Sequence, residues 1–291
     1  MTESLFVPVQ GHRLHLRRQG PEAGQPVLML HGAISNGRTF YSDSGKGLGP
    51  FLAEAGFCVY VADLRGRGLS EPRIGRDAGH GQLESIRDDI PALQAFIQGR
   101  HGGAKVHWLA HSWGGVLMAS TLARFPALAD GVESLTFFGS KRSIRSWSLE
   151  RLLKVELVWK RLAPRWVAKH GYLPARAKKI GADDETAGSL AHSIAWVNKG
   201  PWVDPQDGFD YGKAAAGVDW PRTWLLAGKG DKTLGNPKDV ALFQQEMKAQ
   251  GELTLLGRSG GFRRNYDHLN MLVGEDAATE LYPLVLAWLR R

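Results

Sequence analysis

The chain has 291 residues, of which 43% are hydrophobic and 23% are charged. This composition excludes a disordered or fibrous protein and allows one large domain or two small ones. No run approaches the roughly 18 consecutive apolar residues of a membrane-spanning helix, and the first residues are too charged for a secretory signal. The single cysteine, Cys58, cannot form an internal disulfide bond, which fits a reducing compartment. We therefore expect a cytoplasmic globular protein.

The net charge of +8 is concentrated in one part of the chain. Between Lys141 and Gly181 there are twelve basic residues and two acidic ones, so the remainder carries a small negative charge. A protein adapted along its length to the phosphate backbone of nucleic acids would spread its basic residues more widely. We expect no specific nucleic-acid partner, and weak association of the basic segment with an anionic membrane surface.

Short apolar runs alternate with helical patterns through the first 140 residues. Two alternating segments, 5–9 and 13–18, predict a β-hairpin around a polar turn. Continuous apolar runs predict buried strands and helical periodicity predicts helices between them: strands 26–30, 57–62, 106–110 and 132–138, and helices 48–55, 83–98 and 113–125. This alternation predicts an α/β fold with a mostly parallel, doubly wound sheet.

The same rhythm returns near the C-terminus, with strands 222–227 and 252–256 and helices 237–249 and 276–290. Between the two halves the alternation stops, and residues 141–212 hold five of the ten tryptophans together with the basic cluster. Neither half has a complete sheet alone. We therefore predict one core made of residues 1–140 and 213–291, interrupted by a helical insertion at 141–212.

The sharpest motif is Ala-His-Ser-Trp-Gly-Gly at 110–115, which follows a predicted strand and opens a predicted helix. This is the context of a nucleophile elbow, a turn that lifts the hydroxyl of Ser112 clear of the sheet. It also leaves the next backbone amides at a helix N-terminus, aimed at developing negative charge. Ala110 replaces the glycine usual at that position, a change of one methyl group. A simple helix-capping serine is the structural alternative.

Four further motifs stand in a fixed order around this one. His-Gly-Ala at 31–33 ends the third predicted strand, and Asp-Leu-Arg-Gly-Arg-Gly-Leu-Ser at 63–70 follows the fourth. Ala-Gly-Lys-Gly-Asp at 227–231 leaves a later strand, and Asn-Tyr-Asp-His at 265–268 precedes the last helix. Together these motifs resemble the α/β-hydrolase superfamily, in its serine esterase and lipase-like branch. The resemblance covers nearly the whole chain outside the insertion.

The resemblance implies a catalytic triad in the order Ser112, Asp231, His268. His268 would take the proton of the weakly nucleophilic hydroxyl, and Asp231 would hold the imidazole. The backbone amides of Ala33 and Trp113 would form the oxyanion hole. Asp267 is an alternative partner for His268.

We expect a substrate pocket that includes Ile34, Trp147 and Trp159, and an insertion that acts as a cap over it. In this superfamily a segment leaving the sheet at that point usually covers the active site. Apolar residues at helical spacing predict the face of the cap that covers an acyl pocket: Leu149, Leu152, Leu153, Val155, Val158, Trp159 and Leu162.

The implied function is the hydrolysis of small carboxylic esters with hydrophobic acyl groups through an acyl-enzyme. The same triad also serves thioesterases, lactonases, peptidases and carbon–carbon bond hydrolases, and the motifs do not separate these. A non-catalytic binding protein on the same fold is a further alternative. Scattered histidines and the lack of a phosphate-binding or dinucleotide fingerprint predict neither a metal nor a cofactor.

Overall fold

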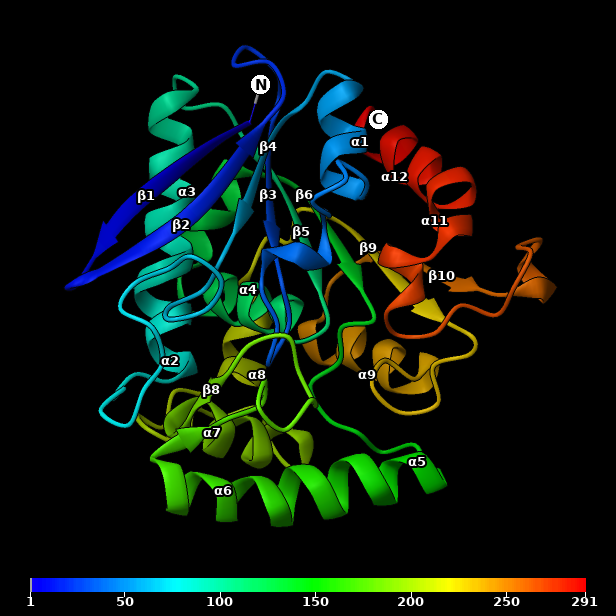
Figure 1. Ribbon diagram of the computed structural model, residues 1–291. Coiled ribbons are helices and arrows are strands. Elements are labelled where there is room, and N and C mark those ends of the chain that lie inside the picture. Colours follow the sequence, from blue (N-terminus) through cyan, green and yellow to red (C-terminus); the bar gives the residue numbers. More distant parts are fainter. Residues whose placement is uncertain (1) are drawn as a thin grey trace.

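An eight-stranded sheet forms the centre of the protein, as seen in a computed structural model that describes residues 2–291 (Figure 1). The strands lie in the order β1-β2-β4-β3-β5-β6-β9-β10, and those from β4 to β10 are parallel. Only β1 and β2 run antiparallel to their neighbours. The predicted mostly parallel, doubly wound sheet is confirmed.

The strand boundaries agree closely with the apolar runs of the sequence. The hairpin turns at Gln10 and Gly11, both with positive φ, because a two-residue turn of this kind matches the twist of the flanking strands. The strands are β1 (Thr2–Val9), β2 (His12–Gln19), β3 (Pro26–Leu30), β4 (Cys58–Ala62), β5 (Val106–His111), β6 (Val132–Phe138), β9 (Arg222–Gly228) and β10 (Gly251–Leu256).

Helices cover both faces of the sheet, and neighbouring residues of one strand enter different cores. Leu28 and Leu30 pack into the core under α3 (Ile90–Arg100) and α4 (Trp113–Arg124). Val27 and Met29 point to the opposite face, under α1 (Leu48–Glu54) and the C-terminal helices. Burial on both faces explains why these strands are continuously apolar.

Two predicted helices differ in their boundaries. The helix expected at 83–98 runs from α2 (Gln82–Glu84) through η2 (Ser85–Asp89) to the end of α3. The helix expected at 276–290 is interrupted between α11 (Glu275–Glu280) and α12 (Tyr282–Leu289). Pro283 causes this break, because proline lacks the amide hydrogen and its ring collides with the preceding turn.

The segment 141–212 lies beyond the carboxyl ends of the parallel strands (Figure 1). A long helix crosses the base of the molecule, made of α5 (Leu149–Arg151), η4 (Leu152–Leu162) and α6 (Ala163–His170). It is followed by the strand pair β7 (Tyr172–Leu173) and β8 (Glu185–Thr186) and by α7 (Ala187–Val197). The short α8 (Tyr211–Ala214) and then β9 return the chain to the sheet, and α9 (Pro237–Met247) and α10 (Asn270–Val273) complete the helices.

Candidate active site

Ser112 occupies the sharp turn between β5 and α4, with φ 53° and ψ −123°. A positive φ is strained for a residue with a side chain and is maintained only where the surroundings enforce it. Here the Ser112 amide donates to the carbonyl of Phe138 at 2.8 Å, which ties the turn to β6. A Cβ at Gly114 would overlap the carbonyl oxygens of Leu30 and His31, so the helix can approach the sheet this closely only with glycine there.

Ser112, His268 and Asp231 form one hydrogen-bonded chain. The Oγ of Ser112 lies 2.8 Å from Nε2 of His268, and Nδ1 of His268 lies 2.7 Å from Oδ2 of Asp231. Because a carboxylate only accepts, Nδ1 carries the hydrogen and Nε2 is left to accept the hydroxyl proton. Burial raises the pKa of Asp231, but the hydrogen bond from His268 and nearby backbone amides outweigh it and hold that pKa below its usual value.

The loops that carry these side chains are fixed to one another. The Gly230 amide donates to the Tyr266 carbonyl at 2.8 Å, which joins the loop of Asp231 to the loop of His268. Behind them, Nε2 of His111 donates to the His268 carbonyl at 2.8 Å. Burial lowers the pKa of His111 to about 3, so this histidine is neutral and serves as a fixed donor.

Asp267, the alternative partner for His268, is engaged elsewhere. Its carboxylate accepts from the amides of Leu269 and Asn270 and from the Asn270 side chain. The orientation of the imidazole therefore depends on Asp231.

Two backbone amides beside Ser112 are free to bind an oxygen. Within residues 2–291 neither the Ala33 amide nor the Trp113 amide donates to an acceptor. The loop of Ala33 lies against the serine, since a Cβ on Gly32 would come within 2.9 Å of the Ser112 Cβ. His31 shapes this loop by donating to the Gly32 carbonyl and accepting from the Leu64 amide. The arrangement matches the predicted oxyanion hole, whose role remains a proposal.

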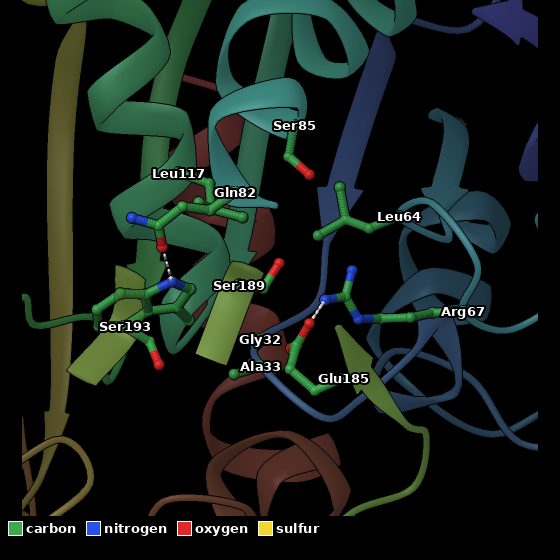
Figure 2. A pocket seen from close by; sticks show the side chains of 11 residues that line it. Gly32, Ala33, Leu64, Arg67, Gln82, Ser85, Leu117, Glu185, Ser189 and Ser193 are labelled. Atoms are coloured by element: carbon green, nitrogen blue, oxygen red, sulfur yellow. Dashed lines mark hydrogen bonds and ion pairs between the residues drawn. The ribbon is translucent and has the colours of Figure 1, made fainter. Parts of the chain in front are cut away.

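A small cavity of about 10 Å³, room for one water molecule, adjoins these amides (Figure 2). Its wall combines apolar and polar side chains from the core and from the insertion: Gly32, Ala33, Leu64, Arg67, Gln82, Ser85, Trp113, Leu117, Glu185, Ser189 and Ser193. Residues of β8 and α7 thus face the proposed oxyanion hole directly.

Charged groups fasten the insertion to the core at this cavity. Arg67 and Glu185 form an ion pair in which both side chains are buried (Figure 2). Glu185 also lies 3.4 Å from the Ile34 amide, and Asp183 accepts from the Gly68 amide at 2.6 Å. The pairing of Arg67 with Glu185 was not predictable from local patterns, because the two residues are 118 positions apart. Its one signal in the sequence was the acidic run at 183–185, directly after the basic stretch.

Of the three predicted pocket residues, Ile34 and Trp159 lie near the cavity and Trp147 lies away from it. Ile34 and Trp159 both pack against a small apolar cluster between the insertion and the loop of Ala33. The Trp159 indole donates to the Ser193 hydroxyl at 3.0 Å, which brings it to the edge of the cavity. Trp147 is 72% exposed and lies beside α9. Its assignment to the pocket is wrong, because the chain passes along the outside of α9 before the long helix begins.

Only part of the apolar stripe predicted to cover the pocket faces the core, and its first half faces outward. Leu149 and Leu153 are 70% and 61% exposed, and Leu152 is also exposed. Only Val155 is fully buried, while Val158, Trp159 and Leu162 are partly buried. Helical periodicity identifies a shared face but not the side on which the core lies.

Within residues 2–291, no group of three His, Cys, Asp or Glu side chains has an arrangement that could hold a metal ion. The helices of this part of the chain all lack the combination of length and hydrophobicity that a membrane-spanning helix requires.

Comparisons with known proteins agree with this architecture. A sequence profile of the alpha/beta hydrolase fold matches residues 25–173. Human lysosomal acid lipase/cholesteryl ester hydrolase is 25% identical over 152 residues, 49% of this chain, but the match spans only 38% of that lipase.

Two solved structures show a likeness of fold over almost the whole chain. The thermophilic esterase from Thermogutta terrifontis has a TM-score of 0.64 at 15% identity and covers 99% of this chain and 98% of its own. The thioesterase domain from the curacin biosynthetic pathway has a TM-score of 0.61 at 17% identity and covers 99% of both chains. With the profile match over more than half of its length, the chain belongs to the α/β-hydrolase fold family.

Proposed function

We propose that the protein is a serine hydrolase that cleaves carboxylic esters through an acyl-enzyme. The observation that carries this proposal is the hydrogen-bonded chain from Ser112 through His268 to Asp231. A serine hydroxyl is a weak nucleophile until a neighbouring base accepts its proton, and this geometry provides the base. Lipase and esterase relatives agree with this chemistry.

In the first half of the reaction, the Ser112 oxygen attacks the ester carbonyl carbon while its proton passes to Nε2 of His268. The carbonyl oxygen becomes negative and is bound by the amides of Ala33 and Trp113. His268 then gives the proton to the leaving alcohol oxygen as the carbon–oxygen bond breaks, leaving an ester on Ser112. Asp231 stabilises the imidazolium and fixes its tautomer.

In the second half, water takes the place of the alcohol. Its proton passes to His268, its oxygen attacks the acyl carbon, and the same two amides bind the second oxyanion. Collapse of this intermediate releases the carboxylic acid and returns the proton to Ser112. Losing one oxyanion donor typically costs ~10²–10³ in rate.

The cavity limits the acyl group that this site accepts. Leu64, Leu117 and Trp113 offer apolar surface, but the volume of about 10 Å³ leaves room for little more than a methyl group unless the insertion moves. The proposed acyl group is therefore hydrophobic and short, and we expect acetate and propionate esters to be turned over faster than octanoate esters. Thioesters, lactones, amides and cleavable carbon–carbon bonds remain alternatives, tested by offering matched acyl groups in each linkage.

Covalent labelling separates a hydrolase from a non-catalytic binding protein. A fluorophosphonate should label the protein once, at Ser112, because only an activated serine reacts readily. Ser112→Ala should abolish labelling and ester turnover, while Ser44→Ala, an exposed serine, should change neither. Full turnover by Ser112→Ala would refute the assignment, and an unlabelled, inactive parent protein would favour a binding function.

We also propose that the long helix of the insertion rests on an anionic membrane surface. Large apolar side chains project outward from it and from the residues before it: Trp147, Leu149, Leu152, Leu153 and Leu157. Glu150 and Glu156 pair with Lys154 and Lys160. Further along, three exposed basic residues have no ion-pair partner within residues 2–291: Arg161, Arg165 and Lys169. An outward apolar face next to free positive charge is typical of helices that bind anionic lipid.

Vesicle sedimentation tests this second proposal. The parent protein should bind phosphatidylserine vesicles at ~10 mM salt, where charges are weakly screened, and bind phosphatidylcholine vesicles less. Leu149→Ser with Leu153→Ser should weaken binding, whereas Leu284→Ser, an exposed leucine of α12, should not. If the parent protein binds neither kind of vesicle, the proposal is overturned.

A further inference from the structure

Lys141 is a buried cation next to the proposed reaction centre. It lies three residues after the end of β6, its side chain is 4% exposed, and its ammonium lies over the indole of Trp113, 5.7 Å from the ring centroid. Burial lowers the pKa of Lys141 to about 8, although Asp231 and Asp239 act in the opposite direction. The side chain is therefore mainly protonated at neutral pH.

This ammonium has no partner in the part of the chain that the structure describes, as hydrogen bond or as ion pair. The two nearby carboxylates are engaged elsewhere. Asp231 binds His268 and the Thr233 amide, and Asp239 accepts from the amides of Arg145 and Ser146. Burying an unpaired charge is costly, and buried charges are normally paired. A partner for Lys141 would therefore come from outside the chain.

The position of Lys141 indicates what that partner is. Trp113 supplies one of the two amides proposed to bind the oxyanion, and it lines the cavity shared with Ala33. Gly139, two residues before Lys141, lies against His268, since a Cβ there would come within 3.1 Å of Nδ1. The ammonium thus lies against the side chain of the residue that supplies this amide. A molecule held at Ser112 is the nearest source of a negative group.

We propose that Lys141 binds a carboxylate carried by the substrate, so that the preferred ester bears one negative charge away from the bond that is cleaved. This inference rests on the proposed serine hydrolase function. A single charge fits best, because Asp231 and Asp239 would repel the second charge of a phosphate monoester. The carboxylate belongs either to the acyl part or to the alcohol part, and the two give different outcomes below.

Matched pairs of esters test the proposal kinetically. Mono-p-nitrophenyl glutarate and its neutral methyl ester place the charge on the acyl part, while 4-acetoxybenzoate and methyl 4-acetoxybenzoate place it on the alcohol part. Lys141→Met keeps an apolar stem and removes the charge. It should raise KM about 10- to 100-fold for the charged ester of one pair, the loss typical of a hydrogen bond to a charged group. KM for the neutral esters should change less than about twofold. Lys213→Met, an exposed lysine, should change none of them.

A binding measurement separates this inference from the proposed function, because it needs no turnover. In the Ser112→Ala protein, the charged ligand of the preferred pair should raise the unfolding temperature, since a ligand that binds the folded state stabilises it. This ligand is monomethyl glutarate for a charge on the acyl part and 4-acetoxybenzoate for a charge on the alcohol part, and its neutral methyl ester should have no effect. Adding Lys141→Met should remove the effect of the charged ligand. If no ester is hydrolysed but this shift is present, the proposed function fails and the carboxylate site stands. Equal losses on charged and neutral esters, or a shift that survives Lys141→Met, would overturn the site.

Discussion

Arg67 and Lys141 are both buried cations near Trp113, and they differ in having a partner. Arg67 pairs with the carboxylate of Glu185 from the insertion, whereas Lys141 faces an indole and no free anion. The charge of Arg67 is neutralised within the chain, and the ion pair joins the insertion to the core. The charge of Lys141 lowers the stability of the folded state, and a bound anion would restore that stability. The role of a buried charged side chain therefore depends on its partner and not on its burial alone.

Breaking the compensated pair should have the largest effect on stability. Glu185→Gln leaves the Arg67 guanidinium buried without its carboxylate and loosens the Ile34 loop, so we expect a loss of about 3–5 kcal/mol in the free energy of unfolding. Urea denaturation measures it. Glu22→Gln removes the carboxylate of the exposed pair with Arg100 and should cost less than about 1 kcal/mol. Similar losses of unfolding free energy in the two variants would show that the ion pair of Arg67 and Glu185 does not hold the insertion on the core.

Removing the unpaired charge of Lys141 should change the free energy of unfolding less, and in the stabilising direction. Protonated Lys141 destabilises the folded state, because burial lowers its pKa from 10.5 to about 8. This penalty is fully present below pH 8 and disappears as the pH rises towards 10.5. Lys141→Met should therefore stabilise the protein at pH 7 by a few kcal/mol, with the gain shrinking above pH 8. If Lys141→Met is destabilising at pH 7, the ammonium has a stabilising partner within the chain and resembles the charge of Arg67.

The smallest effect concerns pH and substrate charge. Binding of a carboxylate requires protonated Lys141, so kcat/KM for the charged ester should fall as the pH rises through about 8, levelling off at the roughly 10- to 100-fold loss expected for Lys141→Met. The other titratable groups facing Lys141 are Asp231, Asp239 and the neutral His111. Burial holds the pKa of His111 at about 3, and hydrogen bonds hold the pKa of Asp231 below its usual value. The neutral ester should show no such fall, nor should the charged ester with Lys141→Met. A fall shared by both esters would assign the transition to another group.

Much of the core was predictable because its signals are local. Six of the eight strands were visible as apolar runs and the two strands of the hairpin as alternating segments. Ser112 was visible because it directly follows a predicted strand and precedes a predicted helix, the setting of a nucleophile elbow. His268 and Asp231 were implied by the resemblance to the α/β-hydrolase superfamily, and the hydrogen bonds from Ser112 to His268 and from His268 to Asp231 agree with it.

The insertion was less predictable because its contacts are long-range. Periodicity grouped Leu149, Leu152 and Leu153 on one face but could not tell which face meets the core. Lys141 looked like one more member of a solvated basic cluster, since its burial depends on the return of the chain at β9 and α9. Trp147 was misplaced for the same reason, because a large apolar residue near the site in sequence need not lie near it in space.

The strand order allows the segment between β6 and β9 to be exchanged between proteins. β6 and β9 are hydrogen-bonded neighbours, with Ser134 opposite Arg222, yet the whole insertion lies between them in the chain. The sheet therefore needs only a connection of the right handedness between these strands, and its architecture does not specify the helices that the connection contains. A chimera can therefore carry another family member's segment between Phe138 and Arg222 and keep the sheet and the turn at Ser112. The grafted segment must supply a carboxylate that pairs with Arg67.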